Sequence, residues 1–328
     1  MSDDKAPTSP TAGSGAAPAN SPAKQCTTCT VTLNAKDIKI CGANKTRDVK
    51  ATGTPGGGSY TFSSGDPDVA SVTGSDDTGT IKAKKQGTST IKVTYNVAGC
   101  SPCTDTAVVK TCICNPKSGG GRFYAYAQKS KANLNGGKAK IKTHYGKLCC
   151  EDMGCTDLGK NNAYVNISSG GKWAQTGYRR IRNDGSTTYT KMRYTEMNGA
   201  VYKRKDDTAG APAEGTTHEY RIELDTATGT WDYLFDGTSW STFLDNGWKD
   251  TSGSVVQWPG ELVNKEDDMM GTSADKCNFT ECQYRTTAKA DFVDAGITAT
   301  DLRTDDSSEW GIELVSGTAF NIWDKNPN

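Results

Sequence analysis

Short stretches in which apolar and polar residues alternate run along most of the chain, and this pattern predicts half-buried β-strands. Turn formers such as Gly56-Gly57-Gly58, Asp66-Pro67 and Gln86-Gly87 separate them. In the N-terminal third, the candidate strands are at residues 31–33, 37–40, 48–52, 59–64, 69–72, 80–84, 88–97 and 106–110. Seven or eight strands in about 85 residues is the number expected for an immunoglobulin-like β-sandwich.

A second, longer series of alternating segments follows residue 121. Its candidate strands are at residues 138–145, 163–168, 173–182, 187–197, 217–225, 230–236, 254–258 and 309–315, and residues 241–248 have the spacing of an amphipathic helix. Residues 115–121 contain a proline and three consecutive glycines, which predict a linker. The chain is therefore predicted to be all-β, with an immunoglobulin-like sandwich at residues 25–114 and a larger antiparallel jelly-roll-like sandwich at residues 122–328.

The first 24 residues differ in composition from the rest. They contain almost no large apolar side chains, so they predict a flexible tail, which is a candidate contact for assembly with other subunits. The opening residues have neither the basic region nor the apolar run of a secretion signal. We therefore expect export by another route or an earlier removal of the signal.

Charge and hydropathy exclude two classes of partner. The 38 basic and 38 acidic side chains cancel, so no overall field favours a nucleic acid. The longest apolar runs are a few residues, too short for membrane insertion. The remaining candidate partners are a glycan, a peptide or other protein subunits.

The cysteines indicate the compartment. An even number, twelve, in a glycine-rich chain favours disulfides formed outside the cytoplasm: extracellular, on the cell surface or in the periplasm. Zinc is the alternative, because Cys26-x2-Cys29 and Cys100-x2-Cys103 are paired CxxC elements. Cysteines scattered beyond those pairs favour disulfides, so neither a metal nor another cofactor is predicted. The predicted disulfide residues are Cys26, Cys29, Cys41, Cys100, Cys103, Cys112, Cys114, Cys149, Cys150, Cys155, Cys277 and Cys282.

The distribution of these cysteines predicts a covalent connection between the domains. Seven precede the linker and five follow it. If all are bridged within one chain, at least one bridge crosses between the domains, because both numbers are odd. We expect that bridge to join Cys112 or Cys114 to the vicinal pair Cys149–Cys150. Cys277 and Cys282, with four residues between them, are expected to close a loop.

The first sandwich resembles a known module. The run Phe62-Ser-Ser-Gly-Asp-Pro-Asp-Val-Ala-Ser-Val, followed by Gly79-Thr-Ile-Lys-Ala and Gln86-Gly-Thr-Ser-Thr-Ile-Lys-Val-Thr-Tyr95, is similar to the bacterial immunoglobulin-like modules of intimin and invasin type. The resemblance covers residues 26–113 and implies a spacer or adhesive stalk. Some such modules accompany proteins exported by contractile injection systems. The many cysteines are a departure from these modules.

Two segments of the second sandwich resemble neprosin-like domains. They are Trp173-Ala-Gln175-Thr-Gly177-Tyr178 and Val255-Val-Gln-Trp258-Pro-Gly-Glu261-Leu-Val, the latter followed by Met270-Gly271. The resemblance covers residues 160–295. It implies a double-sheet jelly roll and, from the plant members, a glutamic peptidase that cleaves at proline.

A glutamic peptidase needs two carboxyl groups close together, one protonated and one ionised. Glu261 stands where the second motif places its glutamate, whereas the first motif has Gln175 instead of a carboxylate. Glu196 is the substitute, because a hairpin through Asn183-Asp184-Gly185 would bring it beside Gln175 on one sheet face. Alternatively, these glutamates line a concave sheet that binds a ligand, or they form the carboxylate pair of a glycoside hydrolase.

Aromatic residues in these strands offer a platform for a sugar or a proline ring, although most such rings are expected in the core. The candidate ligand-binding residues are Tyr178, Tyr194 and Trp258. The sequence as a whole predicts an exported or surface-associated binding or structural protein that presents a jelly roll on an immunoglobulin-like stalk. The alternatives are an acid-active glutamic endopeptidase that uses Glu261 with Glu196 or Gln175, and a cargo or spike-associated component of a contractile secretion system.

Overall fold

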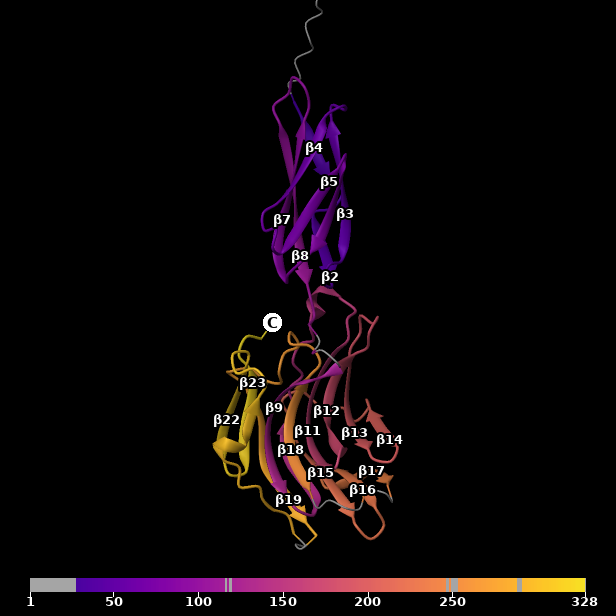
Figure 1. Ribbon diagram of the computed structural model, residues 1–328, viewed down its shortest axis with the longest axis vertical. Helices are drawn as coiled ribbons and strands as arrows, with labels where there is room; N and C mark the ends of the chain where they lie inside the picture. Colours follow the sequence, from indigo (N-terminus) through magenta and orange to yellow (C-terminus); the bar gives the residue numbers. More distant parts are fainter. Residues whose placement is uncertain are drawn as a thin grey trace, which may run out of the picture.

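The computed structural model describes residues 28–115, 117, 120–245, 248, 253–287 and 291–327. Throughout these ranges the regular structure consists of β-strands and two short 3-10 turns, at Glu151–Met153 and Ala299–Asp301. The strands form two sandwiches that lie end to end along the long axis of the molecule (Figure 1). The predicted fold class, an immunoglobulin-like sandwich followed by a larger jelly-roll-like sandwich, is confirmed.

The first sandwich consists of two four-stranded sheets with the orders β1-β3-β6-β5 and β2-β8-β7-β4. Its strands are β1 (Thr30–Leu33), β2 (Asp37–Cys41), β3 (Thr46–Thr54), β4 (Ser59–Ser64), β5 (Ala70–Ser75), β6 (Thr78–Ala83), β7 (Gly87–Asn96) and β8 (Cys103–Cys112). Strand β7 shows why they form: Ile91, Val93 and Tyr95 are buried, while the residues between them face outward. This alternation fills the space between the two sheets.

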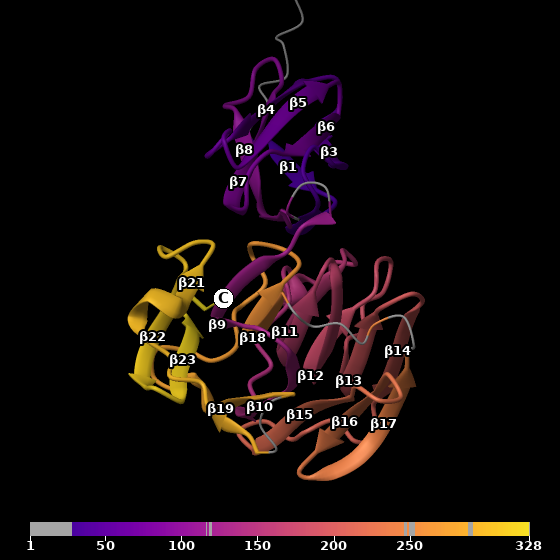
Figure 2. The same ribbon diagram turned by 60° about the horizontal axis from the view of Figure 1, so that its bottom comes forward.

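The second sandwich packs a seven-stranded sheet against an eight-stranded one. The seven-stranded sheet has the order β14 (Tyr202–Asp207), β13 (Thr190–Asn198), β12 (Lys172–Arg182), β11 (Gly159–Ser169), β18 (Ser254–Leu262), β9 (Phe123–Lys131) and β21 (Leu302–Thr304). The other contains β17 (Thr238–Leu244), β16 (Thr230–Phe235), β15 (Thr217–Asp225), β10 (Leu134–Lys142), β19 (Cys277–Thr286), β23 (Ala319–Asp324) and β22 (Trp310–Ser316), with β20 (Val293–Asp294) paired to β19. Figure 2 shows strands β9, β18, β11, β12 and β13 side by side.

The core of the second sandwich lies between its two sheets. Four fully buried tryptophans among the described residues, Trp231, Trp248, Trp258 and Trp310, belong to it. Strand β11 sends Ala163, Val165 and Ile167 into this core, so its alternate residues stand on the opposite face of the seven-stranded sheet. In the part of the chain that the structure describes, no second sheet covers that opposite face.

Two local predictions for this sandwich are wrong. Residues 241–248 do not begin a helix, because Thr238–Leu244 form β17, which pairs with β16 through the tight turn Asp236-Gly237. Cys277 and Cys282 are free and buried. Both lie within β19, where five steps of extended strand span up to about 16 Å, and even with the irregularity at Glu281 the chain does not fold back to the 4.4–6.8 Å or so that a disulfide allows between Cα atoms.

Three disulfides join the two sandwiches: Cys41–Cys155, Cys112–Cys150 and Cys114–Cys149. The last two have the partners expected from the sequence. A further bridge, Cys29–Cys103, lies within the first sandwich. Cys100 is also disulfide-bonded, whereas Cys26 and the whole tail of residues 1–24 lie outside the described residues. The relative position of the two sandwiches is therefore set by covalent bonds.

Candidate functional site: a polar groove on the seven-stranded sheet

A groove of about 530 Å³ lies over the face of the seven-stranded sheet that is turned away from the core. Most of the side chains around it are polar or aromatic, and they come from β9, β11, β12, β13 and β18 and from the segment just before β9. The lining residues are Gly120, Arg122, Tyr124, Tyr126, Lys160, Tyr164, Asn166, Ser168, Trp173, Gln175, Glu196, Gln257, Pro259 and Glu261. The groove thus gathers residues that are far apart in the sequence.

A row of amides and one carboxylate crosses the floor of the groove. Strand register places Glu196, Gln175, Asn166, Gln257 and Gln128 opposite one another on five successive strands. We call these five residues the amide row; the first four line the groove, and Gln128 extends the row beyond it. Its four inter-strand steps, of about 4.8 Å each, span roughly 19 Å. It is a line of hydrogen-bonding groups that faces away from the core.

Hydrogen bonds between neighbours hold the amide row in place. The Gln175 amide donates to Glu196 over 2.9 Å, and the Asn166 amide donates to Gln257 over 2.9 Å. Gln257 in turn donates to Gln128 over 3.3 Å. Because each amide carries two donor hydrogens and two acceptor lone pairs, these contacts leave part of its capacity for a ligand.

Aromatic rings lie on both sides of the amide row. Trp173 stands two residues before Gln175 on the same face of β12, and its ring meets that of Tyr202 edge to face with the centroids 6.3 Å apart. Tyr164 stands on the other side, two residues before Asn166. Between Tyr164 and Tyr194, strand β12 carries Gly177, where an added Cβ would lie 2.5 Å from the Tyr164 Cβ. Glycine at that position therefore lets the two tyrosine rings pack across the strand.

Glu196 is held by arginines at one end of the groove. Its carboxylate accepts a hydrogen bond of 2.5 Å from Arg179 and lies 3.5 Å from Arg204. Arg179 is fully buried, also pairs with Asp206, and stacks on the ring of Tyr194 with its guanidinium carbon 4.2 Å from the centroid. Because both carboxylates have arginine partners, the charges at this end compensate one another.

Glu261 lies at the opposite end of the groove with different partners. It accepts a hydrogen bond of 2.6 Å from the Tyr164 hydroxyl, and the side-chain nitrogens of Lys160 and Arg122 each lie 3.4 Å away. Burial, together with the nearby Glu261 carboxylate, raises the pKa of Tyr164 well above its usual value. The same two causes raise the pKa of Tyr124. Both phenols therefore stay neutral and can donate hydrogen bonds.

Two groups beneath the groove have unused hydrogen-bonding capacity. Asn162 is fully buried between Arg179 and Glu261 in the register, and neither polar atom of its side chain has a partner among the described residues. The Tyr194 hydroxyl is likewise buried without one. Neither side chain is among those that line the groove, so both lie beneath its floor.

The three candidate catalytic residues lie on the same face and line the same groove, and Gln175 and Glu196 are in contact as the predicted hairpin required. Glu261 lies three strands from Glu196 and four residues further along the sheet. In a flat sheet this offset puts the two Cα atoms roughly 19 Å apart. A shared-proton pair needs carboxyl groups a few ångströms apart, and here each carboxylate has its own cations instead. The catalytic assignment stays a prediction.

The predicted ligand-binding aromatics are not accessible. Tyr178 and Trp258 point from the other face of the sheet into the core, where the Tyr178 hydroxyl donates to the Lys142 carbonyl oxygen and the Trp258 indole N–H to that of Lys138. Tyr194 is on the groove face but is completely covered. The alternation of strand residues explains the error, since Tyr178 and Trp258 are each an odd number of positions from the groove residues Gln175 and Glu261.

Residues on strand β11 and just before β9 were not identified from the sequence. In β11 the polar positions Asn162, Asn166 and Ser168 alternate with Ala163, Val165 and Ile167, which is the signal that could have revealed a polar face. Arg122 and Lys160 carry no comparable local signal. They reach the groove only through the pairing of β18 with β9 on one side and β11 on the other.

Comparison with known families supports the first sandwich. Residues 26–104 match the bacterial Ig-like domain (group 2), which confirms the immunoglobulin-like prediction for this part of the chain. No curated protein matches the chain. The neprosin resemblance stays a prediction.

Solved structures with a likeness to this chain include three β-rich proteins. They are a glycoside hydrolase family 16 endo-glucanase from Bacteroides ovatus (11% identity, TM-score 0.28, 63% of this chain and 82% of that chain), a laminarinase from Flavobacterium sp. UMI-01 (12%, 0.27, 58% and 70%) and sheep galectin-11 (13%, 0.24, 46% and 94%). Identities under 25% and TM-scores under 0.5 are too low to support an argument about function. The function is therefore argued from the groove itself.

The disulfides and the bacterial Ig-like domain together indicate an extracellular or cell-surface protein. Within the described ranges, no helix is long and apolar enough to cross a membrane.

Proposed function

We propose that this protein binds a neutral glycan in the groove of the seven-stranded sheet and presents that groove on an immunoglobulin-like stalk. The observation that carries the proposal is the amide row with aromatic rings on both sides. Sugar rings have hydroxyl groups around their edge and apolar C–H faces. Side-chain amides match the hydroxyls and aromatic rings match the faces.

The charges in the groove favour a neutral ligand over an acidic one. Arg179 and Arg204 are already paired with Glu196 and Asp206, and Arg122 and Lys160 lie on either side of Glu261. An anionic ligand would have to compete with these internal carboxylates. A hydroxyl-rich ligand instead uses the remaining lone pairs and donors of the amides without displacing a charge.

In this proposal the stalk comprises residues 25–114 and the presenting domain residues 122–328. The stalk sets the groove away from its attachment, and the three crossing disulfides fix its direction. An exported or surface-associated binding protein needs both properties, a spacer and a rigid connection.

The test is binding to an array of neutral and acidic oligosaccharides, followed by calorimetry with any neutral ligand that is retained. Trp173→Ala and Gln175→Ala should each weaken binding by about tenfold, the worth of one ring contact or one or two hydrogen bonds. Trp323→Ala is the matched control, since Trp323 is also half-buried but lies in β23 of the other sheet. Absence of any retained glycan, or equal losses in the control, would contradict the proposal.

A glutamic endopeptidase is the second candidate, supported by the fact that Glu196 and Glu261 open into one groove. Its test is cleavage of a proline-containing peptide library from about pH 3 to about pH 7 by the wild-type chain and by Glu261→Gln. Cleavage in acid that is lost in the variant would establish the peptidase. Cleavage at no pH would leave binding as the function of the groove.

The third candidate, a component of a contractile secretion system, rests on the sequence of the first sandwich and on residues 1–24, which lie outside the described residues. Co-purification of the full chain with assembled particles, lost when residues 1–24 are removed, would support it.

A further inference from the structure

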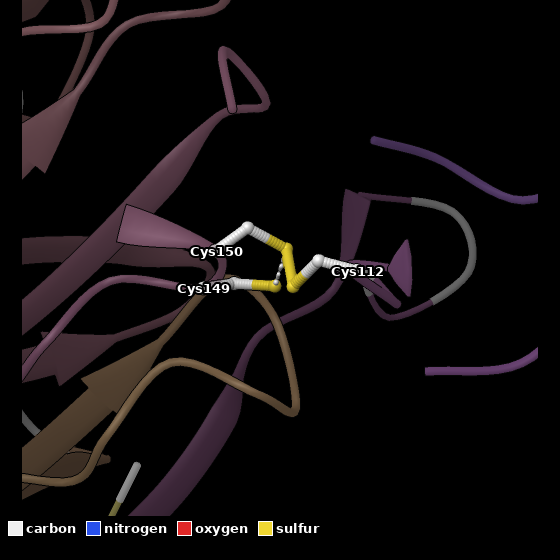
Figure 3. Close-up of side chains that lie close together, drawn as sticks. All are labelled: Cys112, Cys149 and Cys150. Carbon is white, nitrogen blue, oxygen red and sulfur yellow. Dashed lines mark hydrogen bonds between the residues drawn. A yellow bond between two sulfur atoms is a disulfide. The ribbon is translucent and has the colours of Figure 1, made fainter. Parts of the chain in front are cut away.

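Four cysteines meet at the junction between the two sandwiches. Cys112 is the last residue of β8 and Cys114 follows it, whereas Cys149 and Cys150 belong to the connection between β10 and β11. Figure 3 shows Cys112 extending from the first sandwich toward Cys149 and Cys150 of the second. We call these four residues the junction cluster.

The sulfur atoms of the junction cluster are closer together than two separate disulfides require. Cys150 is bonded to Cys112, yet its sulfur also lies 3.3 Å from that of Cys114 and 3.2 Å from that of Cys149. The sulfurs of Cys112, Cys149 and Cys150 all lie within 4.8 Å of one another. The sulfur of Cys114 adjoins this group of three through its bond to that of Cys149.

We propose that reduction of its two disulfides turns the junction cluster into a four-thiolate site for zinc or another thiophilic divalent metal. In a tetrahedral zinc site, bonds of about 2.3 Å place the ligand sulfurs about 3.8 Å apart. Two of the four sulfur pairs that are not bonded here, Cys114–Cys150 and Cys149–Cys150, are already within about 0.6 Å of that separation. The two bonded pairs must open, and the sulfurs of Cys112 and Cys114 must approach each other; side-chain rotation supplies both movements.

The backbone around the cluster is held by contacts that do not depend on the disulfides. The Cys149 N–H donates to the buried Asp267 carboxylate over 2.7 Å, and Arg182 donates to the Cys149 carbonyl oxygen over 2.5 Å. On the other side, the Cys112 carbonyl oxygen accepts from the Gly42 N–H over 2.9 Å. These contacts hold each cysteine pair within its own sandwich when the sulfur–sulfur bonds are broken, and the metal would then join the two pairs.

The chemistry balances with a dithiol as reductant. Each bridge accepts two electrons and two protons to give two thiols, while one dithiol is oxidised to its own disulfide. Binding of one divalent metal ion then displaces four protons from the four thiols and leaves a site with a net charge of about −2. Exchange with the oxidised, disulfide form of the dithiol reverses both steps: each bridge re-forms as one such disulfide takes up two electrons and two protons, and the metal is released.

The consequence is one domain arrangement in two redox conditions. Where thiols stay reduced, as in the cytoplasm, the metal holds the sandwiches together. After transfer to an oxidising compartment, the disulfides take over that role with the same residues. This inference does not depend on what the groove binds.

The experiment titrates the full chain, reduced with a phosphine and freed of metal, with cobalt(II) as a coloured substitute for zinc and then with zinc as competitor. We expect one cobalt ion per chain with the spectrum of a tetrahedral tetrathiolate, and a zinc Kd below about 10⁻⁷ M. The double variant Cys112→Ser/Cys149→Ser should lose this spectrum. The control variants Cys29→Ser/Cys103→Ser and Cys277→Ser/Cys282→Ser should keep it.

A second measurement uses the wild-type chain alone, so it does not depend on the folding of a variant. The reduced chain is alkylated with and without zinc, and the modified cysteines are identified by mass spectrometry. Zinc should slow the alkylation of all four junction cysteines and leave Cys29 unaffected. A reduced chain that binds no cobalt, a tetrathiolate spectrum that survives in the Cys112→Ser/Cys149→Ser variant, or protection of other cysteines instead would overturn the proposal.

Discussion

The two junction disulfides are nested, and this arrangement predicts a non-additive loss of stability. Cys112–Cys150 and Cys114–Cys149 close loops of 38 and 35 residues. Closing a loop of that length in the unfolded chain is worth about 4 kcal/mol on the chain-entropy treatment. Once one bridge is present, the other closes a ring of only about five residues, which is worth about 2 kcal/mol.

Removing either bridge by paired Cys→Ala substitution should therefore lower the free energy of unfolding by about 2 kcal/mol, and removing both by about 6 kcal/mol. The perturbation leaves Cys41–Cys155 and Cys29–Cys103 in place. Differential scanning calorimetry of the oxidised proteins measures the three losses. The decrease in Tm of the variant that lacks both bridges should be about three times that of either variant that lacks one. The same proteins in phosphine and a metal chelator are the control. With all disulfides reduced, the Tm differences between the wild-type chain and the variants should reflect only the changed packing of the substituted side chains.

Two outcomes would refute this reasoning. If either single pair lowers the Tm as much as the double variant, the bridges do not substitute for each other in restricting the unfolded chain. If the decrease in Tm of the double variant is no larger than the sum of the two single decreases, the ring of about five residues does not explain the small effect of removing one bridge. In either event, packing around the sulfur atoms, and not loop closure, would control the stability of the junction.

Three further predictions concern the second sandwich. Arg179→Met should lower the free energy of unfolding by about 3–5 kcal/mol in denaturant titrations, because it leaves the buried Glu196 with only the more exposed Arg204 as a cation. A loss below about 1 kcal/mol would contradict a buried pair. Gly177→Ala should destabilise the sandwich by at least about 2 kcal/mol, since the added Cβ would lie 2.1 Å from a carbonyl oxygen of β11, and an unchanged Tm would show that the strands do not pack so closely. Burial raises the pKa of Cys277 to about 12 and also raises the pKa of Cys282. A thiol reagent should therefore label both cysteines only in denaturant, and labelling of the native protein would place them at the surface.

Much of the fold can be predicted because alternation and turn residues agree along most strands. The hairpin of β12 and β13 is an example: the turn formers Asn183-Asp184-Gly185 and the two alternating segments predict that Gln175 lies opposite Glu196, and the register confirms it. Such local pairings need no knowledge of the rest of the chain. The fold class follows from the sum of many of them.

Other strands give no such signal, for identifiable physical reasons. Strand β14, with the sequence Tyr-Lys-Arg-Lys-Asp-Asp, is an edge strand whose outward charges leave no apolar alternation to detect. Strand β19 begins at Cys277, and the two cysteines in it drew attention to a loop that does not exist. Strand β14 is defined by its pairing with β13, which leaves no signature in its own sequence. Strand β19 is defined by its pairing with β10, which lies far away in the sequence.

The candidate site shows the same division. Glu261, Glu196 and Gln175 stand in segments with a motif and do line the groove, whereas Asn166, Gln257 and the cations around Glu261 reach it only through the order of β12, β11, β18 and β9. Tyr178 and Trp258 are buried because neighbouring residues of a strand point to opposite faces of the sheet, so a shift of one position moves a side chain from the groove face to the core face.

The nested bridges also determine how a pull on the molecule would be transmitted. A load that enters through the N-terminal sandwich travels down β8 to Cys112 and passes directly to Cys150 through the sulfur–sulfur bond. The 37 residues between these two cysteines, among them the glycine-rich segment, are bypassed. A protein tethered at its N-terminal end would therefore transmit tension to its ligand-holding sheet through covalent bonds, and a glycine-rich segment that looks like the weakest part of the chain would carry none of the force.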